Sequence, residues 1–213
     1  MEKFILKSLL ALSLFSLAAC SGVEPTEVSG IDSNVIVSSS FSEYSSEKIH
    51  GSGTIRFLDS LTVSSSKSFA LKASLDDTIA MSSVSVIMYS ANSVMPTNDG
   101  IMVTFSRSGA SVNAQISYNG NAAMVNTSRL SFYFPTSLDL IVEVHNVNSK
   151  ARVLVWRRDM VEYAPATADI DTERAGDLNS SLPVQRGAGP YAGLIIQNST
   201  VTAGRLDSQK VLD

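Results

Sequence analysis

Three carboxylates occupy alternate positions in the segment Asp169-Ile170-Asp171-Thr172-Glu173. Alternate side chains of a β-strand point to the same face, so these acids would lie side by side if the segment were extended. Two carboxyl groups about 5 to 5.5 Å apart are what a retaining glycoside hydrolase needs, one as the nucleophile and one as the acid. The flanking residues 164–166 and 174–176 are typical of loops, so a solvated acidic loop is the alternative interpretation.

The other residues that could carry chemistry match no motif for a nucleophile, a bound phosphate or zinc. His50 and His145 are far apart in sequence and lack metal-ligand spacing. The abundant serines have no base at motif spacing and fit the polar surface of strands. Asn98-Asp99-Gly100 offers a loop carboxylate of the kind that binds calcium, although a turn explains the same residues. We expect no metal and no cofactor.

The N-terminus has the features of a secretory signal that ends at a cysteine. Lys3 and Lys7 accompany an apolar stretch, residues 8–17, that is shorter than the roughly 20 residues of a membrane span. The sequence Leu17-Ala18-Ala19-Cys20 resembles the lipobox of bacterial lipoprotein precursors, in which the signal is cut before the cysteine. The resemblance implies a signal peptide over residues 1–19 and palmitate-type acyl chains on Cys20. An ordinary secretory signal cut near Ala19 is the alternative.

The residues after the lipobox indicate a tether and a location. Ser21 follows the cysteine, where an Asp in many Gram-negative lipoproteins directs retention at the inner membrane; the resemblance therefore implies the outer membrane of a bacterial cell envelope. Residues 20–34 are polar and contain Pro25, which predicts a flexible tether. The net charge of -4 indicates that the chain lacks the basic surface that binds nucleic acid. The N-terminal lipid is therefore the expected contact with the membrane.

From residue 35 onward the pattern predicts a single all-β domain, residues 35–213. Apolar residues alternate in short runs, and no window holds a helical period for three turns. Cys20 is the only cysteine, so stability must come from a core and not from disulfides. The predicted strands are residues 35–39, 53–57, 69–75, 84–89, 101–107, 111–118, 122–126, 130–134, 138–146, 151–158, 194–198 and 201–206. Such spacing is typical of an antiparallel β-sandwich or barrel.

Two hairpins have a register that follows from the alternation of apolar and polar residues. The first turns at Gly109-Ala110 and pairs Phe105 with Ala114, Val103 with Ile116, and Ile101 with Tyr118 on one face. The second turns at Asn148-Ser149 and pairs Val142 with Val155 and Val144 with Val153 on the core face.

The opposite face of the second hairpin carries the only tryptophan among charged side chains. The predicted pairs are His145 with Arg152, Glu143 with Leu154, Ile141 with Trp156, and Asp139 with Arg158. An aromatic ring beside hydrogen-bonding groups suits a sugar ring or a peptide. The candidate binding residues are therefore Trp156, Glu143, His145, Arg152, Asp139 and Arg158. Ordinary cross-strand pairing on a solvent-facing surface is the alternative.

The succession of residues 69–75, 101–118, 138–156 and 193–198 resembles the concanavalin A-like jelly roll, shared by legume lectins, laminin G-like modules and several glucanases. This resemblance spans residues 50–206 and implies a sheet face or rim loops that bind carbohydrate or protein. Within that family, residues 169–173 are similar to the E-x-D-x-E core of laminarinase-type glucanases, with Asp in place of the first Glu.

These expectations lead to three hypotheses. The first is a non-catalytic envelope lipoprotein, anchored by its N-terminal lipid, whose β-sandwich binds a glycan or an envelope protein. The second is a divergent glycoside hydrolase of the laminarinase type. The third is a structural envelope protein without a small ligand.

Overall fold

The computed structural model describes residues 30–37, 41–76, 81–95, 99–118, 121–125, 137–158, 164–178 and 184–207. Its strands are β1 (Gly30–Ile31), β2 (Val35–Val37), β3 (Glu43–Tyr44), β4 (Ile49–Phe57), β5 (Ser66–Leu75), β6 (Ser83–Ser90), β7 (Ile101–Ser108), β8 (Ser111–Tyr118), β9 (Asn121–Met124), β10 (Ser137–His145), β11 (Arg152–Arg157), β12 (Ile170–Asp171) and β13 (Tyr191–Asp207). One 3₁₀ turn, η1 (Pro165–Thr167), is present in this part of the chain. None of the described residues forms a helix long and apolar enough to cross a membrane.

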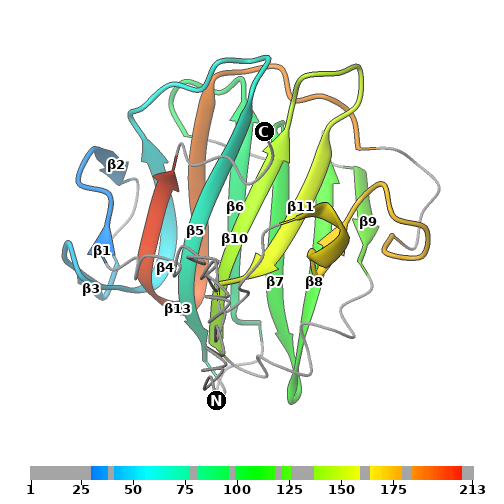
Figure 1. The fold of residues 1–213 in the computed structure, drawn as a ribbon. Helices are drawn as coiled ribbons and strands as arrows, with labels where there is room; N and C mark the ends of the chain where they lie inside the picture. The colour runs from blue at the N-terminus through cyan, green and yellow to red at the C-terminus, as the bar shows by residue number, and fades with distance from the viewer. Residues whose placement is uncertain are drawn as a thin grey trace, which may run out of the picture.

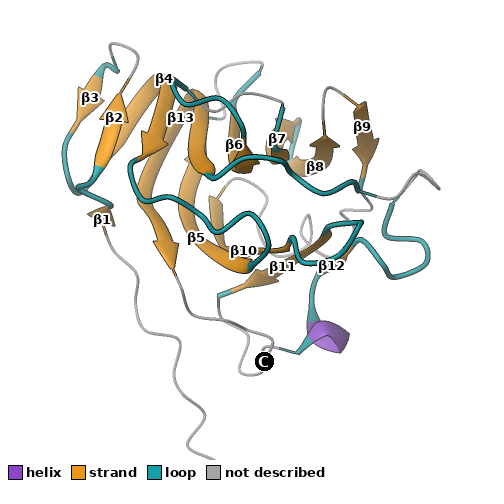
Figure 2. Ribbon diagram, turned by 90° about the horizontal axis from the view of Figure 1, so that it is seen from above, coloured by secondary structure: helices purple, strands orange, loops and turns teal. Residues whose placement is uncertain are grey.

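The strands form a curled sheet that folds into two layers (Figures 1 and 2). Layer I contains β6, β7, β8 and β9, together with the first half of β13 and the second half of β4. Layer II contains β5, β10, β11 and β12, together with the second half of β13. All pairs are antiparallel except that of β1 with β13. The all-β prediction is confirmed, and the molecule is an antiparallel β-sandwich.

Strand β13 belongs to both layers. Residues 191–197 pair with β6, and residues 199–207 pair with β5. The change of partner coincides with an irregularity in its pairing with β4 between Ile196 and Ser199, where Asn198 has a φ of 46°. A bulge of this kind bends a strand and increases its twist. The sequence pattern predicts two strands here, and the structure contains one bent strand.

The core between the layers is built from the apolar alternation that defines the strands. Phe57 of β4 and Phe69 of β5 meet edge to face with ring centres 5.3 Å apart, which joins the two layers directly. Other core side chains with at most 1% exposure include Val84, Val86, Met88, Ile101, Val103 and Phe105 from layer I, and Leu71, Leu138, Leu140, Val142, Val153 and Val155 from layer II. Each such aliphatic or aromatic side chain stabilises the fold by about 1.5 to 3 kcal/mol.

Both predicted hairpin registers are confirmed. In the first hairpin, Phe105 pairs with Ala114 and Ile101 with Tyr118. In the second, the register pairs are Ile141 with Trp156, Val142 with Val155, Glu143 with Leu154, Val144 with Val153, and His145 with Arg152. Asp139 and Arg158 lie just beyond the last register pair, and the Arg158 N–H donates to the Asp139 carbonyl at 2.9 Å.

The predicted tether over residues 20–34 is too long. Gly30 and Ile31 form β1 beside Ala203 and Gly204, and Ile31 is only 7% exposed within the core cluster. Ile31 is apolar in an otherwise polar stretch, and burying it makes this segment part of the sandwich. Residues 1–29, which include Cys20, and the predicted strand 130–134 lie outside the described residues.

One end of the sandwich is crossed by residues 184–190, which Asn146 holds in place. The fully buried Asn146 carboxamide donates to the carbonyls of Val63 and Gly187 and accepts the Gly187 N–H at 2.9 Å. A Cβ at Gly187 would lie 2.5 Å from the Tyr89 Cβ, so this segment packs tightly against the end of β6. Burial raises the pKa of Tyr89 to about 12, and its hydroxyl donates to the Ser65 carbonyl.

Candidate functional site

The six binding residues predicted from the sequence come together on the outer face of layer II, but Trp156 is not an exposed platform. Its side chain has no exposed surface, and its Nε1–H donates to the Ala164 carbonyl at 3.3 Å. It packs with Leu154 and Ala168 in a separate apolar cluster. The expectation of an open aromatic ring is therefore wrong, because the segment that leads through η1 into β12 covers the indole.

The charged residues of this face form cross-strand and inter-segment contacts. Arg158 contacts Asp139 at 3.3 Å, as predicted, and Arg152 contacts Asp171 at 2.7 Å. Glu143 is completely buried, so it is also unavailable to a ligand in this structure. The face therefore combines a covered apolar cluster with ion pairs, which fits the alternative of ordinary pairing better than an open binding patch.

A hydrogen-bonded series of Ser66, His145 and Glu143 lies at one end of β5 and β10. Ser66 is directly opposite His145, with Oγ 2.9 Å from Nδ1, and the Nε2 of His145 meets a Glu143 carboxylate oxygen. In serine hydrolases the serine lies on Nε2 and the carboxylate on Nδ1, so the ring here has the reverse orientation. A buried carboxylate needs hydrogen-bond donors, and we assign His145 the role of partner to Glu143.

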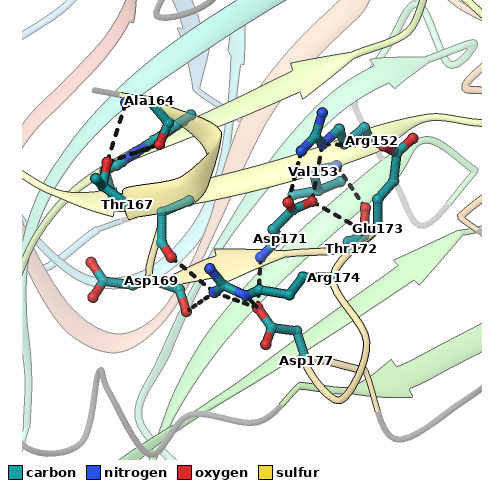
Figure 3. Close-up of polar contacts among 12 residues, drawn as sticks. Arg152, Val153, Ala164, Thr167, Asp169, Asp171, Thr172, Glu173, Arg174 and Asp177 are labelled. Atoms are coloured by element: carbon teal, nitrogen blue, oxygen red, sulfur yellow. Dashed lines mark hydrogen bonds and ion pairs between the residues drawn. The ribbon is translucent and has the colours of Figure 1, made fainter. Parts of the chain in front are cut away.

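The predicted acidic segment forms an arginine-rich cluster at the edge of layer II (Figure 3). Asp171 accepts two hydrogen bonds from Arg152, at 3.0 and 2.7 Å, and a third from the Glu173 backbone N–H. Burial raises the pKa of Asp171, but these hydrogen bonds and the charge of Arg152 outweigh it, so the net pKa lies below the ordinary value. Asp171 therefore stays ionised, and the same contact raises the pKa of Arg152.

The other carboxylates of this cluster are held similarly. Asp169 is 5% exposed and contacts Arg157 at 3.3 Å, while Asp177 contacts Arg174 at 2.6 Å. Glu173 is exposed. Asp169 and Asp171 thus serve as buried partners of arginines, and the segment does not present the pair of free carboxyls that a retaining hydrolase needs.

The described residues offer no metal centre. Histidine, cysteine and acidic side chains nowhere gather there in a group of three that could hold an ion. The Asp99 carboxylate accepts hydrogen bonds from the Ser90 hydroxyl at 2.6 Å and the Ala91 N–H at 3.0 Å. Asp99 therefore stabilises the loop after β6, as the turn interpretation expects. Asn98 lies outside the described residues.

The outer face of layer I has a different chemistry, because hydroxyl and carboxamide side chains form rows across its strands. One row runs through Thr54, Ile195, Ser85, Thr104 and Gln115. A second runs through Gln197, Ser83, Ser106 and Asn113. The hydroxyls of Ser85 and Thr104 are 2.8 Å apart, so neighbouring strands are linked through their side chains as well.

Charge is nearly absent from this surface. Strands β6, β8, β9 and residues 191–197 contain no charged side chain, and β7 contains only Arg107. Arg107 pairs with Val112 on the alternation that carries the core residues, so it does not belong to the outer rows. Among the described strands of layer I, the one charged side chain on the outer face is Arg56 of β4, whose guanidinium carbon lies 5.3 Å from the centre of the Tyr191 ring.

Two carboxamides on this face have unused hydrogen-bonding capacity. Asn113 and Gln115 are half-buried on β8, and neither side chain bonds to another group of the protein in the part of the chain that the structure describes. Each carboxamide has two N–H donors and a carbonyl acceptor. The sequence alternation placed them on the polar face, but only the assembled sheet aligns them with Thr104 and Ser106 of the next strand.

No family model matches this chain, and no curated protein matches it in sequence. Solved structures do match in fold. A legume lectin-like domain from Entamoeba histolytica aligns with a TM-score of 0.52 and 6% identity over 83% of this chain and 91% of that chain. The carbohydrate-binding module CBM66 from Bacillus subtilis aligns with a TM-score of 0.44 and 10% identity over 81% of this chain and 93% of that chain. The fold of this chain is therefore a lectin-like, concanavalin A-like jelly roll.

Proposed function

We propose that this chain is a membrane-anchored envelope lipoprotein whose β-sandwich binds a glycan on the outer face of layer I. The observation that carries the glycan proposal is the near absence of charge on that face, together with its rows of hydroxyl and carboxamide groups. Sugar hydroxyls are neutral donors and acceptors, and such groups match them without the cost of desolvating charges. Met102 in the next row is half-buried and supplies apolar surface for the C–H face of a sugar ring.

The similarity to a lectin-like domain supports the same proposal through the fold alone. Lipid attachment at Cys20 rests on the lipobox resemblance of the sequence, with an outer-membrane location as its consequence. The acyl chains would hold the sandwich at the envelope, since each buried methylene contributes about 0.8 kcal/mol to membrane binding.

A glycan array probed with the purified protein tests this function. We expect binding to a defined set of glycans, and at least a tenfold loss of affinity in Asn113→Leu and Gln115→Leu. Neither carboxamide bonds to another group among the described residues, so both variants should keep the melting temperature of the original. Ser74→Leu, which adds the same apolar side chain to the exposed outer face of layer II, is the matched control. Absence of binding to any glycan would favour the structural, ligand-free alternative.

A further inference from the structure

Two carboxamides on the outer face of layer I are within reach of a ligand. Asn113 and Gln115 of β8 are half-buried, and neither side chain bonds to another group among the described residues. In that part of the chain, the side-chain nitrogen and oxygen atoms that are buried without a partner belong to Arg56, Arg107 and Ser117. The polar atoms of both carboxamides are therefore accessible, and each group offers N–H donors and a carbonyl acceptor.

The two carboxamides lie next to each other on one face of the same strand. In the register of β7 with β8, Asn113 is opposite Ser106 and Gln115 is opposite Thr104, so both belong to the outer face. Alternate residues of an antiparallel strand are about 6.8 Å apart along the strand. Strands β8 and β9 contain no charged side chain, so the surface beside this pair is neutral.

A secondary amide is a neutral group that matches this pair. Its N–H and C=O point in opposite directions, because the amide bond is planar and trans. Hydrogen bonds of about 2.9 Å on both sides place the two partner atoms about 7 to 8 Å apart, close to the spacing of Asn113 and Gln115. One carboxamide can thus donate to the amide oxygen while the other accepts the amide N–H. A sugar hydroxyl, in contrast, carries its donor and its acceptor on a single oxygen.

We propose that Asn113 and Gln115 bind the acetamido group of a sugar from both sides, which makes a glycan that contains N-acetylhexosamine the ligand class of this face. This inference rests on the proposed glycan binding. Met102 supplies apolar surface for the acetamido methyl, because it is half-buried on the same face and diagonal to Gln115. Strands β4, β6, β7, β8 and β9 contain no carboxylate, so they offer no counter-ion to an amino sugar that lacks the acetyl group.

The test is titration calorimetry of the full chain in detergent micelles, with chitohexaose and cellohexaose as probes. The two oligosaccharides share one β-1,4-linked backbone and differ at C2, which carries an acetamido group in the first and a hydroxyl in the second. We expect the original protein to bind chitohexaose at least tenfold more tightly than cellohexaose.

Two nearly isosteric variants test the donor and acceptor roles. Asn113→Asp and Gln115→Glu each replace the N–H donors by a second acceptor oxygen. The variant that loses the donor to the amide oxygen should reduce the preference for chitohexaose to less than about threefold. Gln185→Glu makes the same change at an exposed position on the end of the sandwich, and it should leave the preference unchanged.

Equal affinity for the two oligosaccharides, or a preference that survives in both Asn113→Asp and Gln115→Glu, would overturn the inference. The proposed function is judged separately by Gln115→Leu. If both oligosaccharides bind equally well and Gln115→Leu abolishes the binding of both, glycan binding stands and the acetamido site falls. If neither binds and the array returns only glycans without acetamido groups, the inference is again overturned while glycan binding stands. An array without any bound glycan overturns both.

Discussion

Ile141 lies directly opposite Trp156 in the pair of β10 with β11, yet Ile141 is half-buried whereas Trp156 has no exposed surface. The difference arises because residues 164–168 fold over the Trp156 ring. Ala164 accepts the indole N–H, and Ala168 packs on the ring. A residue that alternation assigns to an outer face has thus become part of a second, smaller core.

Trp156→Ala should therefore reduce the free energy of unfolding by about 3 to 5 kcal/mol, as expected for a buried aromatic side chain. Urea denaturation monitored by circular dichroism measures this loss. Ile141→Ala, on the same face but only half-buried, should cost clearly less. A loss below about 1 kcal/mol for Trp156→Ala would mean that residues 164–168 do not cover the ring in solution.

Asp171 should make the protein sensitive to acid. Its folded pKa is lowered from 3.8, so its ion pair with Arg152 contributes stability above the unfolded pKa. That contribution is lost as the pH falls through the lowered folded value. Asp171→Asn should cost about 2 kcal/mol at neutral pH, and the difference from the original protein should shrink below about pH 4. A difference that stays constant from pH 7 to pH 2.5 in urea titrations would contradict the assignment.

Asn146 should be among the polar residues most sensitive to substitution. Asn146→Ala leaves the Val63 carbonyl and both backbone groups of Gly187 without their side-chain partner in a buried site, which should cost about 2 to 4 kcal/mol. Asn148→Ala, in the exposed turn nearby, is the control and should change stability by less than about 0.5 kcal/mol. Equal melting temperatures for the two variants would show that residues 184–190 are held by other contacts.

Lipid attachment makes a prediction about the precursor. Cys20→Ser should abolish metabolic labelling with palmitate and leave the signal uncleaved, because the thiol is the proposed site of acylation. Labelling is followed by fluorography of the immunoprecipitated protein. Ser21→Ala, next to the lipobox cysteine, should still be labelled. Unchanged labelling of Cys20→Ser would rule out the lipobox.

Much of the sandwich could be predicted because strands such as β7 and β8 alternate between apolar and polar residues. A one-residue slip of β7 against β8 would place Phe105 among polar side chains, so the burial of one face is enough to determine the register. Strands β1, β3 and β12 could not be predicted in this way. Each has two residues, too few to show a period, and each forms because a neighbouring strand offers it a partner.

The candidate site was harder to predict for a related reason. Alternation assigns Trp156 and Asn113 to outer faces, but it does not tell which outer face another segment will cover. The cover over Trp156 comes from Ala164 and Ala168, which are small and belong to no hydrophobic pattern of their own. The serines and amides of layer I fit a polar strand surface, and only the register of four strands shows that they form continuous rows.

The central claim is that a glycan binds the outer face of layer I, and chemical-shift mapping tests it most directly. The ¹⁵N-labelled protein is titrated with the best glycan from the array while its backbone and side-chain amide signals are followed. The largest shifts are predicted at Thr104, Asn113 and Gln115, with the two carboxamide NH₂ groups among them. Shifts centred on Lys72, Asp139 and Ile141, on the outer face of layer II, would contradict the account.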